Sequence, residues 1–474
     1  MKSRDTTIEE YLRKAVEIFY REIAPILYWP LVKITLTSQK LSKERPSTRH
    51  LKQQVSLRAL ISHAERRIPY YRLTHRVLGL ARNSEWNRAD FQTLPCINRK
   101  TLQKYHGFFS RPGFRQHLSA YQITSGTTGS PLVVPITRAR MIHDAVDMAL
   151  QASRLGITVS ARRALRTNYV YITDALGIKG KKRLSVFKLS RFRKYPIPTA
   201  IGDNTFAVIQ EIERHNPTFL AGKASSLVHL ARMCEKAGYP KPGGIRPQLV
   251  FSGAEYLFES DRRLMERIFK GTVVQHYGLT ETGVIGWECS QKDGYHFRED
   301  RFLVEILRSD DHGDDLPRNS GEIVVTDLKN KGFPLIRYRT GDLGEVEDSG
   351  CPCGSSSPKL KLYTGRLTDY FLRSDGSRLN PFGLTLDLRK LPVDQFQLIQ
   401  EAVNVVKIKF SGPVSSSEVL QSVKKRAQVL LDSEAEVTTE HVEYFPQTKE
   451  KFRPYICKIE ETGQEPETLN NDTS

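Results

Sequence analysis

A short loop rich in glycine and hydroxyl side chains is the stretch of this sequence best suited to chemistry. Residues 124–131 read Thr-Ser-Gly-Thr-Thr-Gly-Ser-Pro. Two glycines allow a tight turn that exposes backbone N–H groups, and the hydroxyls add donors, so the loop can surround the oxygens of a polyphosphate. It lacks the Gly-Lys-Ser/Thr ending of a Walker loop. Taken alone, it fits a polar turn between strands equally well.

Three further motifs follow this loop along the chain. Residues 277–282 read Tyr-Gly-Leu-Thr-Glu-Thr, residues 338–343 read Tyr-Arg-Thr-Gly-Asp-Leu, and Gly365 is followed by Arg366. Each of them alone is typical of an ordinary turn. Four such motifs in this order and at these separations are hard to obtain by chance, so we interpret them as one set.

This set resembles the motifs of the adenylate-forming superfamily of acyl-CoA synthetases and adenylation domains, and most closely its phenylacetate–CoA ligase-like branch. Segments 57–64, 69–72, 94–100, 203–204 and 217–220 also match, so the resemblance covers roughly residues 50–455. It implies a reaction that joins a carboxylic acid to ATP, releases pyrophosphate and passes the acyl group to a thiol, usually that of CoA. Such an enzyme must hold ATP, neutralise its phosphates and align the carboxylate with the α-phosphorus.

The resemblance implies a nucleotide site built from two of these regions. The loop would hold the β- and γ-phosphates through Ser125, Gly126, Thr127, Thr128 and Gly129. The adenine would lie between the end of one strand and a tyrosine ring. The strand end is formed by Ser252, Gly253, Ala254 and Glu255, and the ring is that of Tyr277.

The remaining motifs would position the reacting phosphate and the ribose. By resemblance, Thr280 would meet the α-phosphate and Glu281 would hold Mg²⁺, which prefers oxygen ligands beside phosphates. Asp342 would accept hydrogen bonds from the ribose hydroxyls, and Arg366 would lie near the ribose or a phosphate. The acyl pocket would lie near the helix that residues 223–226 open, whose N-terminus and lysine can hold a carboxylate.

The superfamily also uses a lysine from a mobile C-terminal domain. The segment 446–452 resembles the family's terminal loop, and we predict Lys451 as the catalytic lysine, with Lys449 as the alternative. Its ammonium would bridge the carboxylate and the α-phosphate as charge develops. An exposed surface lysine is the plainer interpretation of either residue.

The sequence departs from the family pattern at four positions. A lysine is usual in the phosphate loop near Ser130 or Leu132, an Asp or Lys at Thr368 in the hinge, and a Gly at Glu450. These departures leave open a nucleotide-binding relative that has lost turnover.

Four residues of metal-binding types, three cysteines and one histidine, gather in the second half of the chain. Cys351 and Cys353 form a tight Cys-Pro-Cys knuckle, and Cys289 precedes His296 by seven positions. Three thiolates and one imidazole suit a structural Zn²⁺ site, although reduced thiols in a turn explain the spacing equally well. The resemblance favours zinc, because some members of the branch hold one at similar positions. Cys96, Cys234 and Cys457 are typical of buried thiols.

Composition excludes several classes of protein. The chain has 474 residues, of which 39% are hydrophobic and 26% charged. That is close to an ordinary globular chain and unlike a disordered protein, a collagen or a disulfide scaffold. The longest apolar run, at 23–32, is too short to span a bilayer and contains Pro25 and Pro30. The acidic N-terminal segment does not fit a secretory signal, so we expect a cytoplasmic protein without a transmembrane segment.

The net charge of +19 is unevenly distributed. Residues 159–195 hold eleven Lys or Arg and one acid, Asp174, whereas residues 460–474 hold no Lys or Arg. The basic stretch suits CoA phosphates or an acidic carrier protein, and a plain solvated surface suits it equally. It has no recognisable nucleic-acid motif, so we do not expect nucleic acid as a partner. The acidic end is typical of a disordered tail.

Strands and helices alternate where the motifs must be positioned. Strands at 218–222, 248–253 and 272–277 with helices between them predict a parallel α/β sheet. Strands at 302–307, 321–326 and 335–339 predict a more antiparallel, small barrel-like region. The last block has strands at 405–410 and 442–445 and a helix at 417–431.

From this we predict a fold of helices on mixed β-sheets with three parts. These are a large N-terminal domain (1–365, with a helical extension over 1–50), a small mobile α+β lid (366–459) and a disordered tail (460–474). The expected function is ATP-dependent activation of an aryl or aryl-acetic acid and its transfer to CoA. An amine or a carrier-protein arm as acceptor remains the alternative.

Overall fold

The structure is a computed structural model of the chain. It describes residues 46–77, 91–110, 118–123, 132–155, 168–174, 191–197, 203–308, 317, 319–348, 350–366, 370–385, 388, 391–431, 434–443, 445 and 452–459. The predictions for 1–45, for the phosphate loop at 124–131, for Lys449 and Lys451, and for the tail at 460–474 lie outside these residues.

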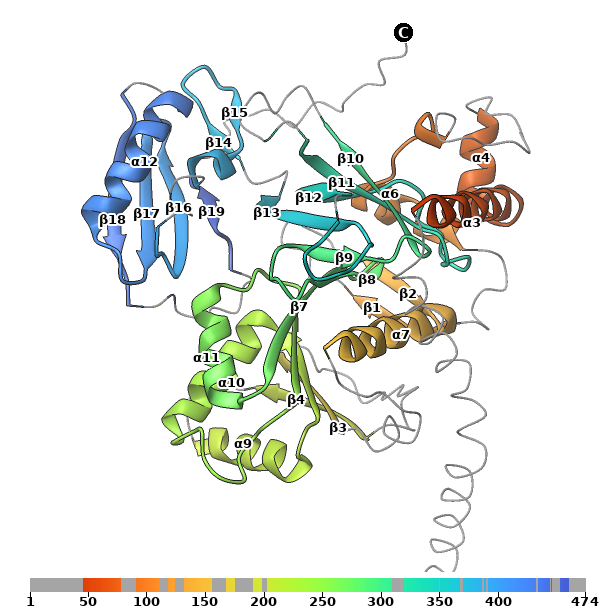
Figure 1. The fold of residues 1–474 in the computed structure, drawn as a ribbon. Helices are drawn as coiled ribbons and strands as arrows, with labels where there is room; N and C mark the ends of the chain where they lie inside the picture. Colours follow the sequence, from red (N-terminus) through yellow and green to blue (C-terminus); the bar gives the residue numbers. More distant parts are fainter. Residues whose placement is uncertain are drawn as a thin grey trace, which may run out of the picture.

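One long sheet forms the centre of the fold (Figure 1). Its eleven described strands are, in spatial order, β10 (Phe302–Leu307), β11 (Gly321–Asp327), β12 (Tyr338–Glu347), β13 (Lys359–Arg366), β9 (Tyr295–Phe297), β8 (Gly283–Glu288), β7 (Thr272–Leu279), β6 (Leu249–Gly253), β5 (Phe219–Lys223), β3 (Asn168–Asp174) and β4 (Arg191–Ile197). Strands β4 to β7 pair in parallel, and every pairing from β7 to β10 is antiparallel.

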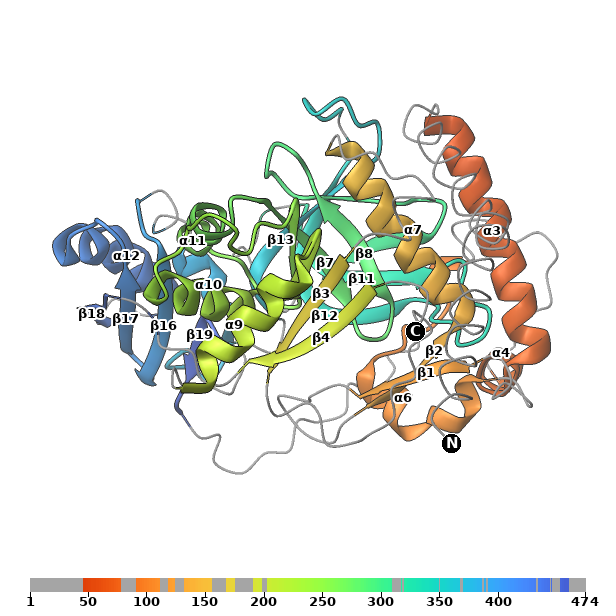
Figure 2. The ribbon, with the colours of Figure 1, turned by 90° about the horizontal axis from the view of Figure 1, so that it is seen from below.

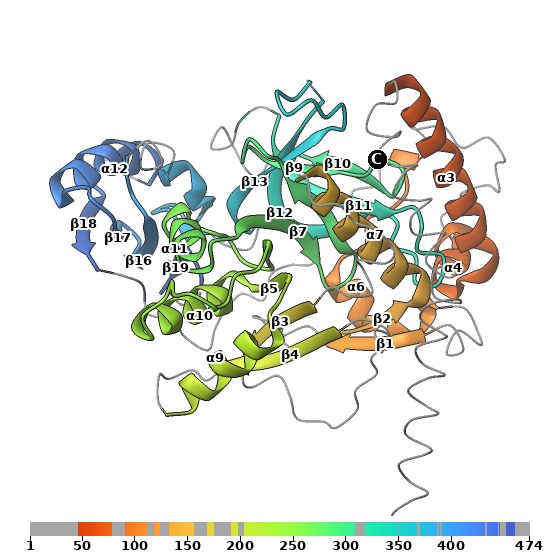
Figure 3. The ribbon, with the colours of Figure 1, turned by 60° about the horizontal axis from the view of Figure 1, so that its bottom comes forward.

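Helices cover both faces of the parallel part, as the strand–helix–strand pattern predicts. Helices α9 (Asp203–His215), α10 (Ala224–Lys236) and α11 (Glu259–Phe269) pack on one face, and α7 (Arg138–Arg154) packs on the other (Figure 3). Strands β5 and β6 are buried along almost their whole length, which explains their continuous apolar sequence. The carboxyl ends of these strands, where α/β sheets bind ligands, carry Lys223 and Gly253.

The antiparallel part differs from the prediction. Within the described residues β10 to β13 continue the central sheet as an open edge, so the predicted barrel-like region is not seen as a closed unit. The strand predicted at 335–339 begins only at Tyr338. Arg337 has a left-handed φ of 51° that interrupts the extended backbone, and its N–H donates to Thr326 Oγ1 at 2.9 Å.

The first described helices pack against this antiparallel edge (Figure 2). Helix α3 (Pro46–Arg67) buries Leu57, Leu60, Ile61 and Ala64, as their three- and four-residue spacing predicts. Helix α4 (Pro69–Val77), α6 (Arg99–Lys104) and the 3₁₀ turn η2 (His106–Phe109) follow, and β1 (Leu118–Ile123) pairs with β2 (Val133–Thr137).

The residues after β13 form a unit with its own core (Figure 1). Its sheet has the order β18 (Glu436–His441), β17 (Val405–Ser411), β16 (Gln395–Ala402), β19 (Tyr455–Cys457), with α12 (Ser416–Leu430) packed against it. Strands β14 (Phe371–Leu372) and β15 (Arg378–Leu379) and the turn η6 (Pro381–Thr385) complete it. The strand predicted at 442–445 is wrong, because β18 pairs in register with β17 and ends at His441, opposite Phe410.

Candidate functional site

A tyrosine and an aspartate from two distant motifs meet beside the antiparallel half of the sheet. Tyr277, near the end of β7, is buried, and its hydroxyl donates to Asp342 Oδ2 on β12 at 2.9 Å. Asp342 is also the register partner of Arg366 on β13. Three predicted ribose and adenine residues therefore come from strands that the fold places close together. The sequence predicted the residues but gave no sign of the Tyr277–Asp342 hydrogen bond.

Glu281 lies in the tight turn between β7 and β8. Its buried carboxylate oxygen Oε1 accepts from the Tyr338 hydroxyl at 3.1 Å and lies 3.5 Å from Arg99 Nη1. Burial and the charge of Glu281 raise the pKa of Tyr338 well above its usual value, so this hydroxyl remains a donor. The carbonyl oxygen of Glu281 accepts from Arg140 Nη1 at 3.0 Å. The Tyr338 and Arg99 contacts thus orient the carboxylate within the turn.

A network of buried charged side chains contacts the same β7–β8 turn through the Thr282 carbonyl. Arg301 is almost completely buried and donates to Asp144 Oδ1 at 2.8 Å, to Asp147 and to the Thr282 carbonyl at 3.2 Å. Gly283 closes the turn with a φ of 82°, and a Cβ there would lie 2.7 Å from Asp144 Oδ1. Because both the backbone conformation and the space exclude a side chain, glycine is required at this position. Sequence reasoning missed this network, because Arg301 lies more than a hundred positions from the two aspartates.

The segment 252–255 is connected to Tyr277 through side chains. Gln275 Nε2 donates to the Glu255 carbonyl at 2.8 Å, and the Tyr295 hydroxyl donates to Gln275 Oε1 at 2.6 Å. Ala254 adopts a left-handed φ of 65° that turns the chain away from β6. The Tyr295 ring in turn lies 6.4 Å from the Tyr277 ring, centre to centre.

The N-terminus of α10 is occupied by the protein itself. Glu255 Oε2 accepts from the Ser225 N–H at 2.9 Å. The interpretation of this helix start as a free anion site therefore needs correction at Ser225, because an internal carboxylate already satisfies that donor. This contact fixes the segment 252–255 to α10.

Aromatic rings line the sheet face that α7 covers. The ring of His276 lies 5.2 Å from that of Trp287, and Trp287 lies 5.3 Å from Phe251. Burial lowers the pKa of His276 to about 4, so its imidazole is neutral at neutral pH. The ring lies directly against Gly253, where a Cβ would be 2.2 Å from His276 Cε1. The sequence analysis did not single out His276.

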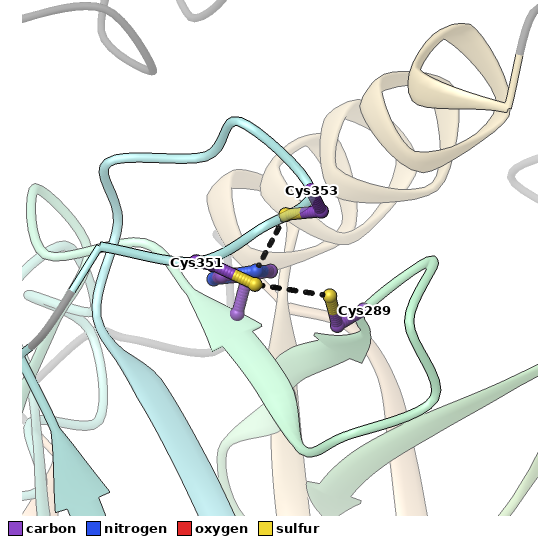
Figure 4. Close-up of side chains that lie close together, drawn as sticks. Cys289, Cys351 and Cys353 are labelled. Atoms are coloured by element: carbon purple, nitrogen blue, oxygen red, sulfur yellow. Dashed lines mark hydrogen bonds between the residues drawn. The ribbon is translucent and has the colours of Figure 1, made fainter.

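The four predicted zinc ligands converge at a second place. Cys289 Sγ lies 3.4 Å from Cys351 Sγ, and His296 Nε2 lies 3.2 Å from Cys353 Sγ (Figure 4). All four ligand atoms lie within 4.8 Å of one another. A tetrahedral zinc with Zn–S bonds near 2.3 Å spaces its sulfur ligands roughly 3.7 Å apart, so this donor set fits Zn²⁺.

Outer contacts orient the same ligands. His296 Nδ1 lies 3.0 Å from the Ser357 carbonyl, which assigns the ring proton to Nδ1 and leaves Nε2 facing the sulfurs. Backbone N–H groups of Gln291 and Ser355 donate to Cys289 Sγ and Cys353 Sγ, both at 3.4 Å. The cluster joins the end of β8, β9 and the turn before β13, and Cys289 follows β8 at the end opposite the turn that carries Glu281.

Several predicted features lie outside this geometry. The phosphate-loop residues, Lys451 and Lys449 are not among the described residues, and Arg366 is described through its backbone pairing alone. Most of the basic stretch 159–195 is likewise undescribed. No helix in the described part of the chain is long and apolar enough to cross a membrane.

Comparisons with known proteins show what this chain is similar to. The family described as AMP-binding enzyme matches residues 110–327. The phenylacetate-coenzyme A ligase of Thermus thermophilus is 26% identical over 359 residues, covering 73% of this chain and 77% of the relative. The phenylacetate-coenzyme A ligase of Pseudomonas putida is 25% identical, covering 79% of this chain and 82% of the relative.

Solved structures give the same fold. A 2-hydroxyisobutyryl-CoA ligase in the postadenylation state superposes with a TM-score of 0.61 at 18% identity, covering 85% of this chain and 88% of that one. The matched family spans the segment 252–255, Tyr277 and Glu281. By these comparisons the chain is similar to AMP-binding enzymes over residues 110–327 and to phenylacetate-coenzyme A ligases over 73–79% of its length.

Proposed function

We propose that this protein is an ATP-dependent acid–thiol ligase. The carboxylate oxygen of the acid attacks the α-phosphorus of ATP, the bond to the β-phosphate oxygen breaks, and pyrophosphate leaves. The sulfur of CoA then attacks the acyl carbon and AMP departs. The observation that carries the proposal is that two motifs far apart in the chain meet at one part of the sheet: Tyr277 and Glu281 of the first contact Asp342 and Tyr338 of the second.

Several of the described residues would face the nucleotide. Asp342, beside the Tyr277 hydroxyl, is suited to accept from ribose hydroxyls, and the segment 252–255 with Tyr277 is suited to border adenine. Thr280 opens the turn that carries Glu281 and would meet the α-phosphate. The phosphate loop at 125–129 would hold the β- and γ-phosphates.

Glu281 is the residue that would hold Mg²⁺. Its oriented carboxylate is the hard oxygen ligand that this ion prefers, and Tyr338 fixes it from the side. When bound, Mg²⁺ would neutralise phosphate charge as pyrophosphate leaves.

We propose residues 366–459 as a lid that brings a lysine to the reacting centre. Lys451 is our choice and Lys449 the alternative, and either ammonium would stabilise charge on the α-phosphate. The lid core touches the large part through Phe258, whose ring lies 5.5 Å from Phe452, the residue after Lys451. Asp394 also pairs with Arg263 at 2.7 Å.

The acid is proposed to be aryl or aryl-acetic, because the curated relatives act on phenylacetate. CoA is the proposed acceptor, and an amine or a carrier-protein arm is the second candidate, suggested by the basic stretch 159–195. ATP and CoA are both available in the cytoplasm, which fits the location expected from the sequence.

The test is pyrophosphate release with ATP and Mg²⁺ across a panel of aryl and aliphatic acids, with hydroxylamine as trap in place of CoA. We expect acid-dependent release in the wild type and a loss of roughly 100-fold or more in Glu281→Gln and Lys451→Ala. The exposed Lys458→Ala, on the lid surface, is the matched control and should stay near wild type. ATP binding without release for any acid would favour a nucleotide-binding relative without turnover.

We also propose that Cys289, His296, Cys351 and Cys353 hold a structural Zn²⁺. Four protein ligands leave no open position for catalysis, so its role would be to fix the strands that they join. Metal analysis should find about one zinc per chain, lost together with several degrees of thermal stability in Cys351→Ser. Cys234→Ser, a buried thiol elsewhere, is the control for loss of a cysteine. A metal-free protein whose melting does not respond to added zinc would contradict the proposal.

A further inference from the structure

Gln275 links strand β7 to the segment 252–255. It lies opposite Ser252 on β6, and its side chain is almost completely buried. Its Nε2 donates to the Glu255 carbonyl at 2.8 Å, and its Oε1 accepts from the Tyr295 hydroxyl at 2.6 Å. A carbonyl oxygen can only accept, so the amide has one possible orientation, in which the tyrosine hydroxyl must be the donor.

Gln275 is held in place through its backbone as well as its side chain. Its backbone N–H donates to Glu288 Oε2 at 3.0 Å, and the other oxygen of that carboxylate accepts from the buried Arg262 on α11. Burial raises the pKa of Tyr295 well above its usual value, so the hydroxyl keeps the proton that it donates to Gln275. Gln275 is therefore a fixed point to which the segment 252–255 is attached.

The segment 252–255 has a backbone conformation that needs such a support. Ala254 has a left-handed φ of 65°, which is unfavourable for a residue with a Cβ. Its side chain is exposed, so packing around that side chain does not impose the conformation. The next residue is instead held twice, the Glu255 carbonyl by Gln275 and the Glu255 carboxylate by the Ser225 N–H at 2.9 Å. A strained residue persists where its surroundings fix it from several sides.

We propose that Gln275 is a positioning residue for adenine nucleotides, which acts by holding Ala254 in its left-handed conformation. This inference rests on the proposed function, in which the segment 252–255 and Tyr277 border adenine. Gln275 and Tyr277 are two positions apart on β7 and so lie on the same face of the strand. The hydrogen bond from Gln275 to Glu255 therefore sets how the segment lies relative to the tyrosine ring.

The size of the effect follows from the population of the left-handed state. An unsupported alanine adopts that state in roughly a tenth of the molecules. Gln275→Leu removes both side-chain hydrogen bonds, so it should weaken the binding of AMP roughly 10-fold, in proportion to the fraction of molecules that can bind. Glycine adopts positive φ readily, so Ala254→Gly should recover most of this loss in the double variant and change the affinity little by itself.

The experiment is calorimetric titration of the full chain with AMP, for the wild type, each single variant and the double variant. AMP is the probe because it has the base and the ribose but lacks the β- and γ-phosphates. Gln53→Leu is the matched control, because Gln53 is also buried and its Nε2 donates to the carbonyls of Glu299 and Phe302 at 3.2 and 3.1 Å. This control should lose stability and still bind AMP within roughly twofold of the wild type.

The double variant separates positioning from a loss of packing, because a glycine at position 254 does not restore lost packing around residue 275. An AMP affinity of Gln275→Leu within roughly twofold of the wild type would overturn the inference. A weakened affinity that Ala254→Gly does not raise would overturn it as well. If Gln275→Leu does not fold, Tyr295→Phe takes its place, because it removes the donor that orients the amide, and the same recovery by Ala254→Gly is required.

The outcomes also distinguish this inference from the proposed function. Pyrophosphate release by the wild type, together with an unchanged AMP affinity in Gln275→Leu, would remove the positioning role and leave the proposed function standing. AMP binding with the expected loss and recovery, but no pyrophosphate release with any acid, would have the opposite meaning. A wild type that binds no AMP would refute both.

Discussion

Replacing Gly253 with alanine tests the packing at the end of β6. A Cβ built on Gly253 would lie 2.2 Å from Cε1, 2.3 Å from Nε2 and 2.9 Å from Cδ2 of His276. Carbon atoms in good contact are about 3.5 Å apart, so the ring or the strand must move by roughly 1 Å. Overpacking of this kind costs about 1–3 kcal/mol. We expect Gly253→Ala to lower the free energy of unfolding by that amount.

The cost depends on how freely His276 can move away. Its ring lies 5.2 Å from the Trp287 ring, which packs on Phe251, and its Nδ1 is buried with no hydrogen-bond partner among the described residues. Moving the ring therefore disturbs the aromatic row beneath α7. We expect the cost to be near the middle of the range.

Urea denaturation followed by tryptophan fluorescence is the assay, because Trp287 lies next to the altered site. In a His276→Ala background the added methyl group should cost little, since the clashing ring is gone, and the double-mutant cycle should give a coupling near the single-mutant loss. Gly107→Ala, where a Cβ meets nothing within 4 Å, is the control. Equal losses in both backgrounds, or a Gly253→Ala protein as stable as wild type, would refute this reasoning.

Three further predictions concern the supports of the site. Arg301→Met should destabilise the fold by about 3–5 kcal/mol, because it strips a buried Asp147 of one partner; a loss below about 1 kcal/mol in denaturation would contradict this. Burial raises the pKa of Asp261 to about 6, so its contribution to stability is fully present below about pH 4 and is lost as the pH rises to 6. Asp261→Asn should flatten the stability profile between these values, and an unchanged slope would argue against it. Phe258→Ala, which removes a ring packed on Phe452, should speed proteolytic release of the lid while the large part keeps its melting temperature; equal release rates would show that this contact does not dock the lid.

The parallel half of the sheet was predictable because its signals are local. The runs at β5, β6 and β7 are apolar, are separated by helices with buried stripes, and lie within a residue or two of their predicted bounds. The predictions failed where pairing or backbone geometry decided the outcome. The left-handed Arg337 delays the start of β12, and the register with β17 ends β18 at His441.

In the candidate site, too, some features were predictable from the sequence and others depended on contacts between distant segments. The sequence motifs predicted Tyr277, Glu281, Asp342 and the four candidate metal ligands, because these residue types have the same chemistry wherever the fold places them. Nothing local in the sequence revealed that Arg99 would stand beside Glu281, since 182 positions separate them and a bridge at Ile97 brings them together.

The sequence by itself determined the resemblance to adenylate-forming enzymes, the order of the strand and helix elements, and the candidate residues for nucleotide and metal. Those properties follow from short-range patterns and from side-chain chemistry. The tertiary structure decided which donors face which acceptors. Glu255 fills the start of α10, Tyr277 reaches Asp342, and Arg301 supports the Glu281 turn. Such contacts join residues far apart in the chain, and burial fixes them only after the sheet has formed, since an unpaired polar group in the interior is costly.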